Sequence, residues 1–417
     1  MAVSTGETDF LRDLRARSYQ EGGVFWVDDG SLAAFEPEAA QQINAANFSN
    51  LALPDKLSDL LRGRAGKPVY WKQMRAVWIE QMRRLSDAEG LRQLAARMSS
   101  LLDERLDRPL DLVWAAQEIS GRSLVPVVMA GLSAPDAGRI LRDQTLKIAN
   151  LLVSEPPRET LRGKLRDVLI QVRAGLVVRR ELRGRATGRR PRRLDLADPT
   201  VDLLPELGMG RAVDAVTGIL TAIAGPPGAA AAGLLYELTL RPEWAERLKA
   251  ELEPIPPADL YNAPTRVAPT THRFVKEALR MWSPTPLVNR SVRTEIRHEN
   301  ACLKEGQQYL LSPDILHHDP RYWKDPDVFN PDRWLHEPGG SHEPGSGACY
   351  VPFGWAPRAC IGASLGTAQL ILLCHLLSTR YRVRLTDPAA VRMALVSVPL
   401  PRNFHGTITR RHGREIS

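Results

Sequence analysis

One cysteine near the C-terminus has the surroundings of a metal ligand. Cys360 lies in the run from Phe353 to Gly362, and an apolar helical pattern begins directly after this run. Backbone N–H groups at the start of a helix stabilise a thiolate, and a thiolate in a dry pocket can ligate haem iron. Cys360 is therefore a candidate iron ligand, Arg358 could pair with a haem propionate, and Phe353 could keep water from the sulfur. A buried cysteine without a ligand, at a loop–helix junction, is the alternative.

A second set of charged residues could hold the chain that leads to this cysteine. Glu277 and Arg280 are three residues apart on a predicted helix that runs from about residue 271 to Ser283, so their side chains share one face. This spacing alone is common for surface ion pairs of small energetic value. Arg333, in the FNPDRW run at residues 329–334, could complete a Glu277–Arg280–Arg333 network, because an arginine fork on a carboxylate has defined geometry. We interpret all three as structural residues.

The order of these motifs resembles that of the cytochrome P450 (haem-thiolate monooxygenase) family, bacterial soluble type. The ExxR, FNPDRW and FxxxxRxCxG motifs follow in the family's order over about residues 270–377, and a WxxxR pattern at residues 71–75 matches a further helix of the family. The resemblance implies haem b (iron protoporphyrin IX) as the cofactor, with Cys360 as its axial iron ligand and Trp71, Arg75, Arg290 and Arg358 at the propionates. It also implies that other residues border the haem, namely Ala224, Phe353 and Gly362.

The predicted long helix over residues 211–240 departs from the family pattern. It should cross the distal face of the haem, where members usually carry Ala/Gly-Gly-x-acid-Thr, whose acid and alcohol help to deliver protons to dioxygen. Ala224 and Gly225 match, but Pro227 replaces the acid and Gly228 replaces the threonine. We count Gly225 and Gly228 with Cys360 as catalytic positions. Two prolines within a helical pattern predict one bent helix here; a linker between two separate helices is the alternative.

Three activities are compatible with the loss of the acid–alcohol pair. Dioxygen could be used with protons from ordered water or from the substrate, hydrogen peroxide could replace dioxygen, or the haem could catalyse a reaction that needs no dioxygen. We favour the first, so the resemblance implies a monooxygenase or oxidative-cyclisation enzyme that tailors a bulky natural product of secondary metabolism. The non-enzymatic alternative is a catalytically silent haem protein that serves as a partner-binding module.

The expected substrate pocket combines the distal helix with two later segments. Small side chains dominate the distal helix, which favours a bulky small-molecule substrate. The pocket residues that we expect are Thr217, Thr221, Pro286, Leu287, Asn289 and Val398, and residues 50–66 would cover them. No reductase sequence is fused to the chain, so the resemblance implies electrons from a separate ferredoxin and ferredoxin reductase.

Composition and pattern set the class of fold. The chain has 417 residues, of which 43% are hydrophobic and 25% charged, and a formal charge of +8; these values fit a soluble globular protein. Helical patterns cover about residues 70–284 and 362–378, and strand-like patterns lie at about 20–55, 285–315 and 380–417. They predict a mainly α fold with a small β subdomain, in a single haem-thiolate domain over residues 1–417.

Three further features could indicate other partners. The arginine-rich run 179–193 could bind nucleic acid or an anionic membrane, but glycines and a proline interrupt it and no aromatic residue accompanies it, so we prefer a solvated loop. His317 and His318 could belong to a metal site, but no further ligands follow at suitable spacing, so we prefer a loop anchor. Because the N-terminus has no apolar segment and prolines interrupt the longest uncharged run, we expect a cytoplasmic protein that binds neither nucleic acid nor a membrane.

Overall fold

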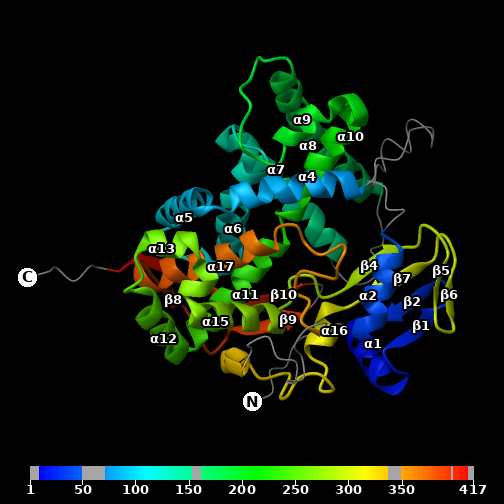
Figure 1. Ribbon diagram of the computed structural model, residues 1–417. Helices are drawn as coiled ribbons and strands as arrows, with labels where there is room; N and C mark the ends of the chain where they lie inside the picture. Colours follow the sequence, from blue (N-terminus) through cyan, green and yellow to red (C-terminus); the bar gives the residue numbers. More distant parts are fainter. Residues whose placement is uncertain (1–8, 49–70, 153–160, 337–348, 396–397, 412–417) are drawn as a thin grey trace, which may run out of the picture.

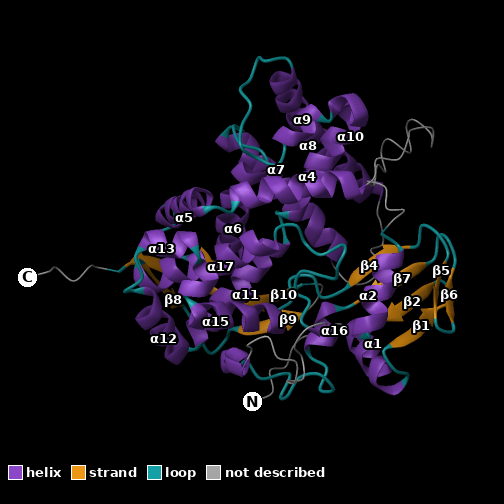
Figure 2. Ribbon diagram, viewed as in Figure 1, coloured by secondary structure: helices purple, strands orange, loops and turns teal. Residues whose placement is uncertain are grey.

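The computed structural model describes residues 9–48, 71–152, 161–336, 349–395 and 398–411. The fold is mainly helical, with small sheets at its edges (Figures 1 and 2). The helices before residue 225 are α1 (Asp9–Gln20), α2 (Pro37–Ala46), α4 (Trp71–Leu85), α5 (Ala88–Asp103), α6 (Leu112–Val128), α7 (Ala134–Leu152), α8 (Leu161–Ala186), α9 (Asp198–Asp202) and α10 (Leu204–Ala222). The later helices are α11 (Pro226–Leu240), α12 (Pro242–Leu252), α13 (Pro257–Asn262), α14 (Pro264–Val267), α15 (Pro269–Met281), α16 (Pro313–His317), the 3-10 helix η1 (Pro331–His336) and α17 (Ala363–Thr379).

The strands join segments that are far apart in the chain. The largest sheet has the order β1 (Val24–Asp28), β2 (Ser31–Ala34), β7 (Gln308–Leu311), β4 (Val288–Ser291); β2 and β7 are parallel and the other pairs antiparallel. The smaller sheets are β3 (Leu110–Asp111) with β11 (His405–Arg410) and β8 (Tyr381–Leu385), β9 (Arg392–Leu395) with β10 (Pro399–Arg402), and β5 (Ile296–His298) with β6 (Ala301–Leu303). The largest sheet therefore unites the N-terminal segment with the chain that follows α15, and it lies on the right of Figure 1.

Two helices form the centre of the helical part because they are apolar on all sides. Every α11 residue from Gly228 to Leu238 is buried, and so is every α17 residue from Ala368 to Ser378. Such helices must be surrounded by other elements, and α11 packs against α6, α15, α17 and strand β10. By length and composition residues 204–240 could also cross a membrane, but 56% of their most apolar window is buried inside the fold, as in the core helix of a soluble protein.

The arginine-rich run is tied to the fold by ion pairs. Arg185 is buried and donates to Asp195 at 2.7 and 2.8 Å and to Glu181 at 3.2 Å. Arg192 reaches Asp198 at 2.9 Å. These bonds connect the C-terminal end of α8 to the segment that leads into α9. The expectation of a solvated loop is therefore wrong for residues 179–186, which continue α8. It is also wrong for Arg185, which is buried among acidic partners from the run itself and from the residues just after it.

Candidate functional site

The Cys360 loop is closed by backbone hydrogen bonds before α17 begins. The Cys360 N–H donates to Phe353 O at 2.7 Å. Gly354 has a φ of 77°, a backbone conformation that favours glycine. The Gly362 N–H, at the N-cap of α17, lies 3.3 Å from Cys360 Sγ and donates to it. The loop and the helix start together fix the position of the sulfur.

Opposing effects set the charge state of the Cys360 thiol. Part of Cys360 is open to solvent, but enough protein surrounds the sulfur that burial raises the pKa of the thiol above its ordinary value. The Gly362 N–H and the Arg75 guanidinium lower this pKa without cancelling the effect of burial. The helix start alone therefore does not favour the thiolate, contrary to the sequence-based expectation. A metal cation at the sulfur would reverse this balance.

Two arginines lie near each other, and each has a buried N–H without a partner. Burial and the nearby Arg358 lower the pKa of Arg290, on β4, to about 10. Burial lowers the pKa of Arg358, in the Cys360 loop, while Tyr309 on β7 hydrogen-bonds to its side chain. Within the described part of the chain, Arg290 Nε and Arg358 Nη1 are buried and have no hydrogen-bond partner. Adjacent cations with unused donors form a site for anionic groups.

Helix α4 supplies a third arginine to the same region. Burial lowers the pKa of Arg75, and electrostatic interaction with Cys360 acts in the opposite direction. Trp71 is the first residue of α4, but its side chain lies outside the described residues. Arg290 and Arg358 therefore lie near each other, with Arg358 in the Cys360 loop, and Arg75 interacts electrostatically with Cys360.

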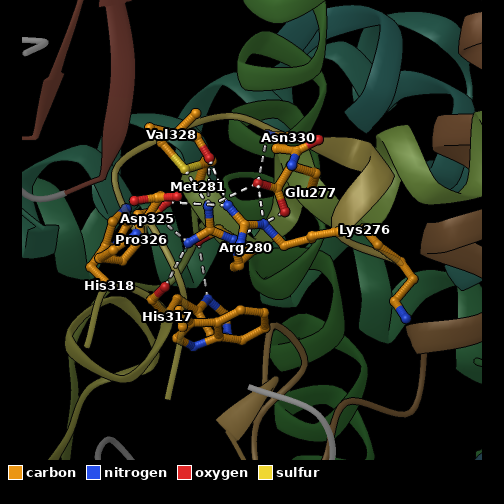
Figure 3. A network of polar contacts seen from close by, with 12 residues as sticks. Lys276, Glu277, Arg280, Met281, His317, His318, Asp325, Pro326, Val328 and Asn330 are labelled. Atoms are coloured by element: carbon orange, nitrogen blue, oxygen red, sulfur yellow. Dashed lines mark hydrogen bonds and ion pairs between the residues drawn. The ribbon is translucent and has the colours of Figure 1, made fainter. Parts of the chain in front are cut away.

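The Glu277 carboxylate is the centre of a buried polar network (Figure 3). Glu277 and Arg280 have fully buried side chains and form two hydrogen bonds of 2.8 and 3.0 Å. Arg333 Nε and the Asn330 N–H donate to one carboxylate oxygen at 3.0 and 2.9 Å, and Trp334 Nε1 donates to the other at 3.0 Å. Burial alone would raise the pKa of Glu277, but Arg280 and Arg333 hold it below its ordinary value. The network joins α15 to η1 and to the coil that precedes it.

His317 lies beside Arg280 (Figure 3) and connects this network to Val351, two residues before the Cys360 loop. The Val351 N–H donates to His317 Nε2 at 2.9 Å, and His317 Nδ1 lies 3.2 Å from Arg280 O. These partners assign the proton to Nδ1. Burial lowers the pKa of His317 well below its ordinary value, which keeps Nε2 available as an acceptor. His317 is thus a loop anchor, as the sequence suggested, and no cluster of three or more His, Cys, Asp or Glu side chains suited to a metal occurs among the described residues.

The distal segment consists of two helices instead of one bent helix. Helix α10 ends at Ala222, and Pro226 and Pro227 are the first two residues of α11. Proline fits the first turn of a helix, where the backbone N–H has no intrahelical partner and the ring meets no preceding turn. The expectation of one bent helix is therefore wrong. The break between the helices comprises residues 223–225, with Gly225 as the N-cap of α11.

Hydroxyl groups from two neighbouring helices hold the break. Thr145 Oγ1, on α7, donates to Ala224 O at 2.7 Å. Ser120 Oγ, on α6, donates to Pro227 O at 3.1 Å. The Ala224 carbonyl, which follows the C-terminal end of α10, lies outside both helices, and the Thr145 hydroxyl supplies its donor; Ser120 adds a bond to the first turn of α11. The contacts of α6 and α7 with the distal helices therefore stabilise the break.

Both threonines predicted for the substrate pocket lie in a polar cluster with Gln144 of α7. Thr221 Oγ1 is 2.8 Å from Gln144 Oε1 and 2.9 Å from Thr217 O. The Thr221 hydroxyl has one hydrogen, so it can donate to only one of these two oxygens. If it donates to Thr217 O, the Gln144 amide is turned so that its NH2 group donates to Thr221 Oγ1. Thr217 Oγ1 and Gln144 Nε2 are buried without a partner in the described part of the chain. The cluster therefore has unused hydrogen-bonding capacity inside the fold.

Gly228 lies in the contact between α11 and α6. A Cβ at this position would lie 2.0 Å from Gln117 Oε1 and 2.7 Å from Gln117 Cα. Glycine is therefore needed at residue 228 for the close approach of two helices. This packing role replaces our interpretation of Gly228 as a catalytic position, because the threonine usual in the family would collide with Gln117.

Asn289 and Arg290 point to opposite sides of β4. Val288 and Arg290 are half-buried, whereas Asn289 and Ser291 are exposed. The Asn289 amide bonds to Gln308 on β7. Because successive side chains of a strand alternate between its two faces, Asn289 does not share the site of Arg290. Its assignment to the substrate pocket is wrong.

The other predicted pocket residues come from segments that meet beside the helical part. Pro286 is buried, and Leu287 packs in an apolar cluster with Leu395 of β9. Val398 is half-buried and directly precedes β10, which packs against α11. The segment after α15 and the β9–β10 hairpin are thus brought together. The predicted covering segment, residues 50–66, lies outside the described residues.

The comparisons with known proteins agree with this arrangement. Residues 229–402 match the family model described as "Cytochrome P450". The chain is 34% identical over 134 residues to cyclooctatin synthase of Streptomyces melanosporofaciens, which covers 31% of this chain and 28% of that protein. It is 33% identical over 162 residues to cytochrome P450 4X1 of Rattus norvegicus, which covers 38% of this chain and 31% of that protein. The matches therefore span about a third or less of these relatives' own length.

Solved structures match over nearly the whole chain. A zebra fish cytochrome P450 with abiraterone has a TM-score of 0.74 at 18% identity and covers 96% of this chain and 99% of that chain. A cyanobacterial cytochrome P450 with retinoic acid bound has a TM-score of 0.74 at 15% identity and covers 95% of this chain and 94% of that one. At such low identity these matches concern the fold.

Gly228→Ala should lower the free energy of unfolding by about 1–3 kcal/mol, because the added methyl group overpacks the α6–α11 contact. The matched control is Gly218→Ala on α10, where a Cβ would meet nothing within 4 Å and alanine should stabilise by about 0.5–1 kcal/mol. Urea unfolding of the two variants measures the difference. Equal stabilities would show that the close approach of Gln117 is not part of the fold.

His317→Phe should lower the free energy of unfolding by about 1–3 kcal/mol, because it preserves the ring but leaves the buried Val351 N–H without an acceptor. His317→Gln offers an amide oxygen in place of Nε2 and should recover most of this loss. The measurement is again urea unfolding, with both variants prepared in parallel. A phenylalanine variant as stable as the wild type, or a glutamine variant no better than phenylalanine, would contradict the anchoring role.

Proposed function

The chain belongs to the cytochrome P450 family, and we propose that it is a haem-thiolate monooxygenase in which Cys360 ligates the iron. The observation that carries this proposal is the Cys360 loop, in which Phe353 O and the Gly362 N–H hold the cysteine at the start of α17. Members of the family bind iron protoporphyrin IX through such a thiolate. Ligation requires the deprotonated sulfur, so haem binding would release the thiol proton.

The arginines near Cys360 fit the two propionate groups of haem. Arg290 and Arg358 each keep a buried N–H without a partner, and each cation destabilises the other's charge. Two carboxylates would supply acceptors and neutralise both cations. Arg75, which interacts electrostatically with Cys360, and Trp71 at the start of α4 are proposed as further propionate contacts. The donor set therefore fits haem.

We assign the remaining roles to residues that orient the cofactor or exclude water. Bound haem supplies the activation of dioxygen, and the protein supplies orientation and electrostatics. Phe353 lies against the first turns of α17, where a Cβ on Gly366 would be 3.6 Å from its ring, and it would shield the sulfur from water. Ala224 and Gly225 in the distal break and Gly362 at the N-cap of α17 would allow close approach of the porphyrin. Glu277, Arg280 and Arg333 would hold the loop without touching the haem.

The distal break favours proton delivery by water or by the substrate. Pro227 and Gly228 have no group that carries a proton. The hydroxyls of Thr145 and Ser120 donate to backbone carbonyls of the break. Water molecules or a polar group of the substrate, held by the Thr217–Thr221–Gln144 cluster, would therefore supply the protons. Because peroxide brings its own protons, the same observation favours a peroxide-using enzyme as the second candidate.

For the substrate, we propose a bulky natural product, and cyclooctatin synthase among the relatives supports this choice. The substrate would contact Thr217, Thr221, Pro286, Leu287 and Val398. A separate ferredoxin and ferredoxin reductase would supply electrons to an enzyme in the cytoplasm. A single haem-thiolate domain over residues 1–417 would carry the whole activity.

The haem-loaded protein should convert the general probe 7-ethoxycoumarin to 7-hydroxycoumarin when a plant-type ferredoxin, its reductase and NADPH are supplied. Cys360→Ala should lower this rate more than about 100-fold, since changes to groups that only support a metal ligand already cost 10–100-fold. Cys302→Ala, which changes an exposed cysteine on β6, should leave the rate unchanged.

The same assay with hydrogen peroxide in place of the electron donors separates the candidates. Product from peroxide alone would favour the peroxide-using enzyme. A folded, haem-loaded protein that forms product under neither condition would contradict the monooxygenase and favour the silent partner-binding module.

A further inference from the structure

Helix α8 is buried on only one of its faces. Ile170, Ala174, Val178 and Leu182 are buried, and they recur every four residues, so they lie on one side of the helix. This side packs against α10, where a Cβ on Gly175 would be 3.5 Å from Val213. In Figure 1 helix α8 lies at the top of the view, in the group formed by α7, α9 and α10.

The opposite face of α8 carries a stripe of exposed aliphatic side chains. Leu165 and Leu176 are 60% and 62% exposed, and the stripe also contains Val168, Leu169 and Val172. Their spacing of three, four and seven residues places all five on one side of the helix. Scattered exposed apolar residues are ordinary, but a contiguous stripe of five indicates an interaction surface. We call these five residues the α8 stripe.

The charge of α8 indicates which partner would cover the stripe. The helix sequence contains eight lysines and arginines, at positions 162, 164, 166, 173, 179, 180, 183 and 185, and two acids, at 167 and 181. Of these, Arg185 is buried and paired with Glu181 and Asp195, so it adds no charge to the surface. Arg173 and Arg180 are exposed and flank the stripe at helical spacing, and the exposed Arg179 and Arg183 continue it toward the C-terminal end of α8. Arg180 also pairs with Asp136 of α7 at 3.2 Å and is still 61% exposed. A second copy of the chain would bring an equally basic helix against this one, and like charges oppose that pairing.

We propose that the α8 stripe docks on an anionic phospholipid bilayer, with α8 lying along the surface of the membrane. An amphipathic helix with aliphatic side chains on one face and arginines beside them buries the apolar face among acyl chains, while the arginines bind lipid phosphates. This differs from our expectation of no membrane partner, which rested on the charged N-terminal residues and on the prolines in the longest uncharged run. A surface helix needs neither.

The test is flotation of the haem-loaded full chain with vesicles of phosphatidylcholine and phosphatidylglycerol at 3:1, and with vesicles of phosphatidylcholine alone. The wild type should float with the anionic vesicles, and high salt should weaken its binding severalfold. The affinity of the variant Leu169→Glu/Leu176→Glu for these vesicles should be at least about tenfold lower, because the variant places charges among acyl chains. The matched control Phe10→Glu changes an exposed apolar residue of α1 and should bind like the wild type.

Three results would overturn the proposal. The first is a wild type that stays unbound with anionic vesicles at low salt, and the second is a stripe variant that floats as well as the wild type. The third is a wild type that binds no vesicles and is dimeric by light scattering, while the stripe variant is monomeric, since a second copy would then cover the stripe. Each variant should keep the carbon-monoxide spectrum of the wild type, so loss of binding is distinguishable from loss of the haem site.

Discussion

The position of Cys360 depends on the buried carboxylate of Glu277. This one group accepts hydrogen bonds from Arg280, Arg333, Trp334 and the Asn330 N–H. Arg280 also donates to His317 O at 2.7 Å, and His317 in turn accepts from the Val351 N–H, two residues before the Cys360 loop. Removing one partner from such a buried ion pair leaves an unpaired charge and typically costs about 3–5 kcal/mol. The α15 helix, the coil and the loop therefore hold together through a single acid.

The distal side of the site has a different physical basis. Uncharged hydroxyl groups stabilise it: Thr145 of α7 donates to Ala224 O in the break, and Ser120 of α6 donates to Pro227 O at the start of α11. The two prolines remove backbone donors at the one place in α11 where the helix does not use them. A sequence that cannot carry protons through Pro227 and Gly228 thus still folds without strain. The fold thus separates a loop that is connected to a buried ion-pair network from a distal segment that is held by uncharged hydroxyl donors.

Much of this arrangement could be predicted from the sequence, since it depends on local spacing. The ExxR pair and the cysteine motif fix their own geometry within a few residues, and the structure joins Arg333 to Glu277 as the motif order implied. The misplaced residues all depend on contacts between distant elements. Asn289 was assigned to the wrong face because strand phase depends on pairing with β7, and the role of Gly228 depends on Gln117 of α6. Thr145 and Ser120 belong to no motif, so only the packing of their helices reveals what they hold.

The account depends most directly on the thiolate of Cys360, and the carbon-monoxide difference spectrum of the reduced, purified wild type tests it. The account predicts the long-wavelength band that is typical of thiolate-ligated haem. A protein shown to be folded and haem-loaded that lacks this band would contradict the assignment of Cys360 as the iron ligand.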